Sequence, residues 1–226
     1  MDAPRDAEHT VSVIRVKRIA AGAPRLMDPD AREWASAPEE VLDLSPTPIL
    51  SQPSLYVQTK WKDGGYGRIP SVRVRAAHDG NAAFFRLSWD DNTKDDAIDD
   101  SDRFADAAAV LFPVKDDAPL TSMGSPEQPV NAWLWRADLE APFNVTAQGI
   151  GTAVRSTDPS LAAQASYANG GWSVVVSRAL QGTGGAAQLK PGQRGKVAFG
   201  VWQGSNAERA GLKAVTLEWQ ELEIEG

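Results

Sequence analysis

Cysteine is absent from this chain of 226 residues, and only two histidines are present. Without cysteine there can be no disulfides, no thiolate metal sites, no cysteine nucleophile and no covalently attached c-type haem. The histidines, His9 and His78, fall near the N-terminus and in a predicted hairpin turn. A catalytic triad or a two-histidine metal site would need one or both of them, so hydrolytic and zinc chemistry are disfavoured.

Long apolar runs are also lacking. No run of roughly 18 apolar residues occurs, so the sequence predicts no membrane-spanning helix. The formal net charge of −7 disfavours nucleic acid and favours a basic partner protein. The first residues lack the basic-then-apolar pattern of a secretory signal. Two interpretations therefore remain open: a cytoplasmic protein, or a mature form without its signal peptide.

What the chain does contain is a series of short strand signals bounded by turn residues. Residues 71–76 alternate apolar and basic positions, and 83–89 follow across a His-Asp-Gly-Asn turn, which predicts a hairpin. Further strands are predicted at 11–16, 107–112, 132–136, 144–148, 163–167, 172–177, 196–202 and 215–224. This pattern predicts an all-β fold: a two-sheet antiparallel β-sandwich with a few short helical turns and long loops.

We expect residues 1–226 to form a single domain, with 1–17 as a loosely held N-terminal extension. No internal repeat is visible. The proline-rich stretch 21–60 predicts coil that wraps around the core. Helical structure is expected only as single turns, after Pro159 and at 207–210.

Two segments far apart in the sequence carry the most informative pattern. Thr-Ser-Met-Gly at 121–124 leads into Pro-Val-Asn-Ala-Trp at 129–133, and Asn-Ala-Glu-Arg-Ala-Gly-Leu-Lys occupies 206–213. Together they resemble the haem b-binding gamma subunit of the periplasmic molybdenum enzymes related to ethylbenzene dehydrogenase. That group includes dimethylsulfide dehydrogenase, chlorate reductase and selenate reductase. The resemblance runs from about residue 18 to the C-terminus, and Phe-Pro at 112–113 matches more weakly.

The resemblance implies one non-covalent haem b per chain, with Met123 and Lys213 as the axial ligands of the iron. A thioether ligand favours ferrous iron, and a lysine must first lose its proton, from a reference pKa of about 10.4. With both axial positions filled, the iron has no vacancy for a substrate. The implied role is electron transfer and not catalysis. The chain departs from the family pattern at Ala214 and Val215, where relatives carry small polar residues, which changes the surroundings of the lysine.

Three further residues are candidates for the haem site. Asn131 would hydrogen-bond a haem propionate or brace the Met123 loop. Trp133 would form a wall of the haem slot, or pack in the sandwich core. Arg209 would pair with a propionate, or with a carboxylate of the chain itself.

The acidic run 90–102 is interpreted as a solvated loop or as a docking patch for a basic electron carrier. It lacks the glycine and the final glutamate of an EF-hand calcium loop.

By the same resemblance, the chain would be a periplasmic electron-transfer subunit. It would sit beside an iron–sulfur subunit that is wired to a molybdopterin subunit, and would exchange electrons with a c-type cytochrome or similar carrier. The main alternative is a carbohydrate-binding β-sandwich without haem, because eight tryptophans would suit stacking on sugars. A haem-free interaction subunit is a third reading, which the presence of both ligand candidates disfavours.

Overall fold

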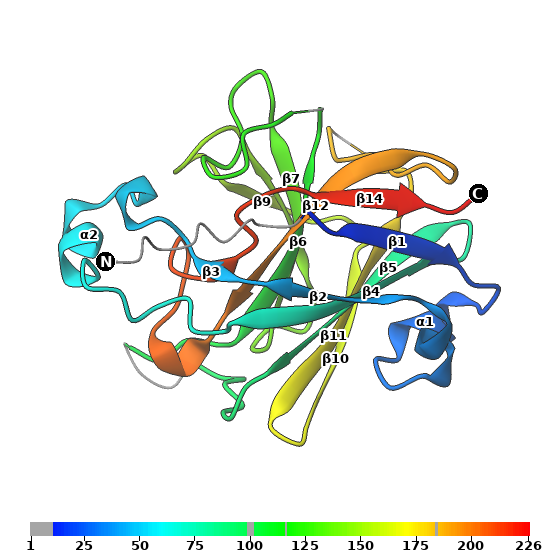
Figure 1. Ribbon diagram of the computed structural model, residues 1–226, viewed down its shortest axis with the longest axis horizontal. Helices are drawn as coiled ribbons and strands as arrows, with labels where there is room; N and C mark the ends of the chain where they lie inside the picture. The colour runs from blue at the N-terminus through cyan, green and yellow to red at the C-terminus, as the bar shows by residue number, and fades with distance from the viewer. Residues whose placement is uncertain (1–10, 99–101, 116, 184) are drawn as a thin grey trace, which may run out of the picture.

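The computed structural model describes residues 11–98, 102–115, 117–183 and 185–226; His9 lies outside the described residues. Strands dominate, with short helical segments in the connections (Figure 1). The strands are β1 (Val13–Arg18), β2 (Glu39–Asp43), β3 (Ser45–Pro46), β4 (Ser71–His78), β5 (Ala82–Asp90), β6 (Ala107–Pro113), β7 (Val130–Arg136), β8 (Phe143–Ala147), β9 (Val154–Ser156), β10 (Ala162–Ala168), β11 (Gly171–Ala179), β12 (Arg194–Trp202), β13 (Ala214–Val215) and β14 (Gln220–Ile224). The helical segments are α1 (Ala23–Met27), η1 (Arg32–Ser36), η2 (Ile49–Ser51), α2 (Leu55–Lys60) and η3 (Gly204–Asn206).

The strands form two layers, and β12 belongs to both of them. Its residues 194–197 pair with β14, whereas 198–202 pair with β6. The first layer has the order β10-β11-β5-β4-β1-β14, and the second runs from β12 through β6, β7 and β8 to β9. The predicted all-β sandwich is therefore confirmed, and the two sheets are joined through one long strand.

Strand β1 differs from two expectations: that the strands pair in antiparallel fashion, and that residues 1–17 form a loosely held extension. It pairs in parallel with β14 and with β4, whereas the other pairs are antiparallel. Its Ile14 and Val16 are each 1% exposed and belong to the core between the layers. Residues 13–17 are thus not a loosely held extension, because a strand paired along both edges is fixed by its neighbours.

The stretch 21–60 is not the plain coil that its prolines predict. It contains α1, η1, β2 and α2, and β2 pairs with β4. Leu26 of α1 and Trp34 of η1 are buried against Phe84 and Val175, on the outer face of the first layer. A few apolar side chains therefore fold this segment onto the sheet, and α1 and α2 lie at opposite ends of the molecule (Figure 1).

Two smaller expectations also need correction. The strand predicted at 215–224 is interrupted, because the Thr216 hydroxyl accepts the backbone N–H of Phe199 at 3.1 Å and the chain turns before β14. The helical turn expected after Pro159 is a non-helical turn, and the one expected at 207–210 is replaced by η3 just before it.

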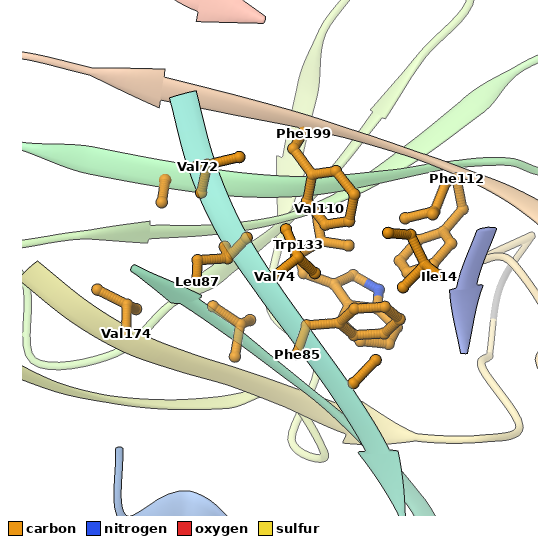
Figure 2. Packing of buried hydrophobic residues seen from close by; sticks show 14 of the residues in the cluster. Ile14, Val72, Val74, Phe85, Leu87, Val110, Phe112, Trp133, Val174 and Phe199 are labelled. Atoms are coloured by element: carbon orange, nitrogen blue, oxygen red, sulfur yellow. The ribbon is translucent and has the colours of Figure 1, made fainter. Parts of the chain in front are cut away.

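Aromatic rings fill the space between the layers (Figure 2). The ring of Trp133 lies 5.8 Å from that of Phe85 and 4.7 Å from that of Phe112, centroid to centroid. Such pairs add about 0.5–1.5 kcal/mol each beyond the area that they bury. Because side chains alternate along a strand, Trp133 and its neighbours at 131 and 135 face this core, and those at 130, 132 and 134 face away from it.

Candidate functional site

The outer face of the second layer is built from small and apolar side chains. Its residues are Ala107, Ala109 and Leu111 of β6, Val130, Ala132 and Leu134 of β7, Phe143, Val145 and Ala147 of β8, and Ala198, Gly200 and Trp202 of β12. We call this surface the outer face. The short side chains at its centre, Ala109, Ala132, Ala198 and Gly200, form an apolar surface that we call the floor. Loops lie along its borders.

Met123 reaches the outer face from the loop between β6 and β7. Its side chain is half-buried and packs against the cluster that includes Val130, Ala132 and Ala198. Its backbone N–H donates to the carbonyl of Leu120 at 3.0 Å, and its own carbonyl accepts from Gly149 N at 3.0 Å. The thioether is therefore positioned by a hydrogen-bonded loop.

The residue after Met123 must be glycine. Gly124 has φ +84°, and an added Cβ would lie 2.8 Å from the carbonyl oxygen of Gln128 and 3.1 Å from that of Ala147. Met123 itself has φ +59°, in the left-handed region that non-glycine residues seldom occupy. Backbone strain of this kind gathers at functional sites. A cavity of about 390 Å³ opens beside this loop and is lined in part by Leu120.

Lys213 reaches the same face from the opposite side. A Cβ added at Gly200 would meet the Cδ of Lys213 at 3.5 Å, so the lysine stem runs over the floor of the outer face. The ammonium lies 5.1 Å from the Trp202 ring centroid and donates to the Ala210 carbonyl at 3.3 Å. Burial lowers the pKa of Lys213 to about 8, and no charged neighbour in the described chain contributes to the shift. This lysine loses its proton far more readily than an ordinary one.

A buried carboxylate holds the loop that carries Lys213. Glu208 is 1% exposed and accepts the backbone N–H of Gly67 at 2.7 Å, that of Gln203 at 3.0 Å and the side-chain amide of Asn206 at 2.9 Å. Hydrogen bonds to a charged group contribute about 1.5–3 kcal/mol each. Glu208 therefore ties the loop to the end of β12 and to the segment before β4.

A second set of contacts fixes the backbone next to Lys213. Thr47 donates its N–H to the Lys213 carbonyl at 3.0 Å and its hydroxyl to the Gly211 carbonyl. The Gln52 amide also donates to Gly211 O, at 3.0 Å. A Cβ on Gly211 would lie 2.1 Å from Gln52 Oε1, so a side chain at this position would displace the Gln52 amide from its hydrogen bond. The sequence pattern did not single out Thr47 or Gln52, which lie about 160 residues before their partners.

Met123 and Lys213 thus border one apolar face from two sides. Leu134 connects the two borders, because it packs against the Met123 cluster and against the Trp202 cluster. A thioether and a readily neutralised amine are both ligands for iron, and an apolar surface between them suits the apolar part of a haem. The residues present therefore fit a non-covalent haem whose axial ligands would be Met123 and Lys213.

The structure corrects the prediction for Asn131. Its side chain is fully buried on the inner face of β7, away from Met123 and Lys213. Its amide donates to Asn144 Oδ1 at 2.7 Å and to Val145 O at 3.1 Å, and its oxygen accepts from Arg178 at 3.0 Å and from Ala187 N at 3.1 Å. Both the nitrogen and the oxygen of the amide already have hydrogen-bond partners within the chain, so neither is free to bind a haem propionate.

Trp133 belongs to the core and not to the wall of the site. It is 0% exposed and shares the inner face with Asn131, while Leu134 occupies the outer face. The alternation of β7 was readable from the sequence, but which side the Met123 loop would cover was not. Trp202 and Leu134 take the place on the outer face that was expected for Trp133.

Arg209 stays a candidate. It is exposed, its guanidinium lies 4.5 Å from the Phe104 ring, and it forms no ion pair with the part of the chain that the structure describes. The intrachain pair considered for it is therefore absent from that part, and its charge is available close to Lys213.

The acidic run 90–102 is only partly a solvated loop, and its residues 99–101 lie outside the described chain. Asp91 is buried, and Asp95 accepts the backbone N–H of Ser205 in η3 at 3.0 Å. Asp96 pairs with Lys94 at 2.6 Å on the surface. Within the described residues, no group of three His, Cys, Asp or Glu side chains could hold a metal ion. A docking role for this run remains a prediction.

The floor of small residues was missed from the sequence. Along β12, Ala198 and Gly200 alternate with the buried Val197, Phe199 and Val201. A period of two with small side chains on one face is the signal that could have indicated a covered or ligand-bearing face.

No helix in the described residues is long and apolar enough to cross a membrane.

Solved structures with a similar fold include carbohydrate-binding proteins. A proposed carbohydrate-binding protein from Bacteroides uniformis has a TM-score of 0.57 and 12% identity, covering 96% of this chain and 100% of that chain. A family 9 carbohydrate-binding module from Caldicellulosiruptor kristjanssonii, in complex with glucose, has a TM-score of 0.51 and 11% identity, covering 95% and 96%. At such identities the likeness concerns the fold alone.

Sequence relatives are more informative. Chlorate reductase subunit gamma of Ideonella dechloratans is 34% identical over 212 residues, covering 93% of this chain and 84% of that protein. Dimethylsulfide dehydrogenase subunit gamma of Rhodovulum sulfidophilum is 33% identical over 222 residues, covering 95% and 81%. A proposed respiratory nitrate reductase heme subunit of Haloferax mediterranei is 39% identical over 153 residues, covering 67% and 55%.

The family model described as Ethylbenzene dehydrogenase matches residues 31–159 and 148–214, which include both Met123 and Lys213. This match spans most of the chain and both borders of the outer face. Together with the gamma subunits that align over nearly its whole length, it shows that the chain belongs to the ethylbenzene dehydrogenase family, among the gamma subunits.

Proposed function

We propose that this chain binds one haem b non-covalently on the outer face and serves as the electron-transfer subunit of an oxidoreductase complex, without catalysing a reaction on a substrate. Met123 and Lys213 are the axial ligands. The observation that carries the proposal is that a thioether and a lysine whose pKa is lowered to about 8 border the same apolar face. The family and the names of the relatives support it.

Several residues of the chain would contribute to haem binding in different ways. A haem held by Met123 and Lys213 would supply a one-electron redox centre. Lys213 gives up its proton and offers its amine, and Met123 offers a soft sulfur that favours the reduced state. The floor around Gly200 and Ala198 excludes water, and Arg209 offers a cation to a propionate near the Lys213 loop.

The proposed setting is a complex in the periplasm. That the chain works in a complex is supported by its relatives, which are subunits of chlorate reductase and dimethylsulfide dehydrogenase. An iron–sulfur subunit and a molybdopterin-containing subunit are the proposed partners. A c-type cytochrome or similar carrier is the proposed external partner. The net charge of −7 supports a basic carrier, because opposite charges speed and orient transient encounters.

A carbohydrate-binding module is the alternative. Stacking on sugars requires exposed aromatic rings, but six of the eight tryptophans are buried: Trp34, Trp89, Trp133, Trp135, Trp172 and Trp202. That alternative also gives no reason for the lowered pKa of Lys213 over an apolar floor. The fold it shares with carbohydrate-binding modules does not decide the function.

The direct test is a visible absorption spectrum of the purified protein, with haem supplied during expression, before and after reduction by dithionite. A sharp Soret band, with the α and β bands of a six-coordinate low-spin haem after reduction, is the expected result. A colourless protein that also fails to take up added haemin would contradict the proposal and favour the sugar-binding alternative, which binding to a panel of oligosaccharides would then examine.

A further inference from the structure

Arg178 places a positive charge in the interior of the sandwich. It lies on β11 and is 0% exposed. Its guanidinium donates to Asn131 Oδ1 at 3.0 Å, to Ala179 O at 3.2 Å and to Ala187 O, and it lies 4.7 Å from the Trp133 ring centroid. All of these partners are neutral groups.

No carboxylate in the described chain pairs with this arginine. Burial lowers its pKa to about 10, and among charged groups only Asp158 opposes the shift. At neutral pH the side chain therefore still carries a full charge in a desolvated place. Burying an ion without a counter-charge is strongly unfavourable. The hydrogen bonds of Arg178 to the carbonyls of Ala179 and Ala187 explain in part why an arginine occupies this position. A neutral hydrogen-bond donor would hold those carbonyls with a smaller desolvation penalty.

The charge lies directly behind the outer face. Asn131 and Trp133, which hold the guanidinium, alternate along β7 with Val130 and Ala132. Those two residues belong to the cluster against which Met123 packs. One sheet layer therefore separates the buried cation from the surface that Met123 and Lys213 border. The space between is filled by backbone and apolar side chains, where charges are weakly screened.

We propose that Arg178 is a fixed buried charge that raises the reduction potential of a haem bound on the outer face. The inference rests on the function proposed above. Oxidised haem carries one more positive charge than reduced haem, so a nearby cation disfavours the oxidised form. Asn131 is then a positioning residue, because its amide oxygen holds the guanidinium against β7.

The test is a potentiometric titration of the haem-loaded protein and of Arg178→Lys, Arg178→Gln and Arg178→Met, at low and at high salt. The Lys variant is expected to stay near the parent potential. The Gln and Met variants are expected to shift to lower potential by similar amounts, and the shift is expected to persist at high salt because the charge is buried. Arg155→Gln is the control: Arg155 is exposed and stacks on Phe143 of the outer face at 4.3 Å, so any shift it causes should fade as salt rises.

An unchanged potential in the Gln and Met variants, with only their unfolding free energy reduced in urea, would overturn the inference and leave Arg178 a purely structural residue. A reduction potential of the Arg178→Lys variant as low as that of the Arg178→Met variant would also overturn it. If these variants do not fold, Asn131→Asp keeps Arg178 and places a carboxylate beside the guanidinium. It should lower the potential as well, and a parent-like potential there contradicts the inference. A parent protein that takes up no haem would contradict the proposed function itself.

Discussion

The side chain of Lys213 lies directly over Gly200, so closely that a Cβ placed on this glycine would come within 3.5 Å of the lysine Cδ. Gly200 has no unusual backbone angle that would require glycine. A side chain longer than a methyl group at this position would occupy the space that the lysine stem takes on the floor of the outer face. This contact joins the Lys213 loop to β12 and defines the path along which the amine would approach a bound haem.

Gly200→Leu should therefore reduce haem affinity at least tenfold while the sandwich stays folded. The larger side chain would displace the stem of Lys213 from the floor. Gly200→Ala is the matched control, since a single methyl group at 3.5 Å makes an ordinary contact. Haemin titration followed at the Soret band measures both variants, with circular dichroism as the check on folding. Parent-like affinity in the Leu variant would argue against this path for the lysine.

The affinity for haem should depend on pH through Lys213. Iron binds only the neutral amine, and the pKa of Lys213 is lowered to about 8. Below that pH the affinity should fall about tenfold per unit, because each binding event releases one proton. Above it the affinity should level off. Titrations at several values between pH 6 and pH 9 test this, and the same affinity at both ends would contradict it.

The lowered pKa of Lys213 also affects the stability of the haem-free protein. Between about pH 8 and the ordinary pKa of 10.5, the folded chain holds Lys213 neutral while the unfolded chain keeps it protonated. The unfolded state then binds more protons, so the unfolding free energy rises with pH in this window. Lys213→Met should remove this rise.

Glu208→Ala should cost about 3 kcal/mol of unfolding free energy and weaken haem binding, because it leaves the buried donors of Gly67 and Gln203 without their acceptor. Glu218→Ala, at an exposed position, is the control and should change little. Urea unfolding monitored by tryptophan fluorescence gives the free energies. Equal stability of the two variants would show that Glu208 does not brace the Lys213 loop.

His78 should make the protein sensitive to mild acid. It is fully buried at the end of β4. Burial lowers its pKa, with Arg18 acting in the same direction and the backbone and charge of Glu225, with Asp79, opposing. The folded state thus binds fewer protons than the unfolded state below about pH 6.5, so stability is lost as the pH falls from there. His78→Phe should flatten this dependence between pH 6.5 and pH 4.5. A parent-like slope in that variant would assign the acid sensitivity to other groups.

Much of the fold was predictable because short strand-forming runs bounded by turn residues mark strands on their own. β4, β5, β6 and β11 lie close to where these runs placed them. The parallel pairing of β1 and the shared use of β12 were not predictable, since they depend on contacts between strands that are not neighbours in the sequence, as in the pairing of Val13 with Glu221 and of Ala198 with Leu111. β2 was hidden because Leu42 is its one fully buried residue.

The site was predictable where it rests on local motifs. Gly124 has a positive φ and meets backbone atoms that leave no room for a Cβ, which explains glycine in the turn after Met123, whereas at Gly211 a Cβ would meet the end of the Gln52 side chain. Asn131 and Trp133 were misplaced because the alternation of β7 separates its two faces without saying which face the Met123 loop covers. Glu208 looked like a surface charge in the motif, and only its contact with Gly67, 141 residues away, identifies it as a buried brace.

The measurement that tests the central claim most directly is ligand identification in the ferric, haem-loaded protein by magnetic circular dichroism in the near-infrared. It should be made on the parent and on Met123→Ala and Lys213→Ala. The parent should give the charge-transfer band of a low-spin haem with one thioether and one amine ligand. Met123→Ala should lose the thioether signature and Lys213→Ala the amine signature, with the sandwich intact in both. Unchanged bands in the two variants would contradict the assignment of Met123 and Lys213 as the axial ligands.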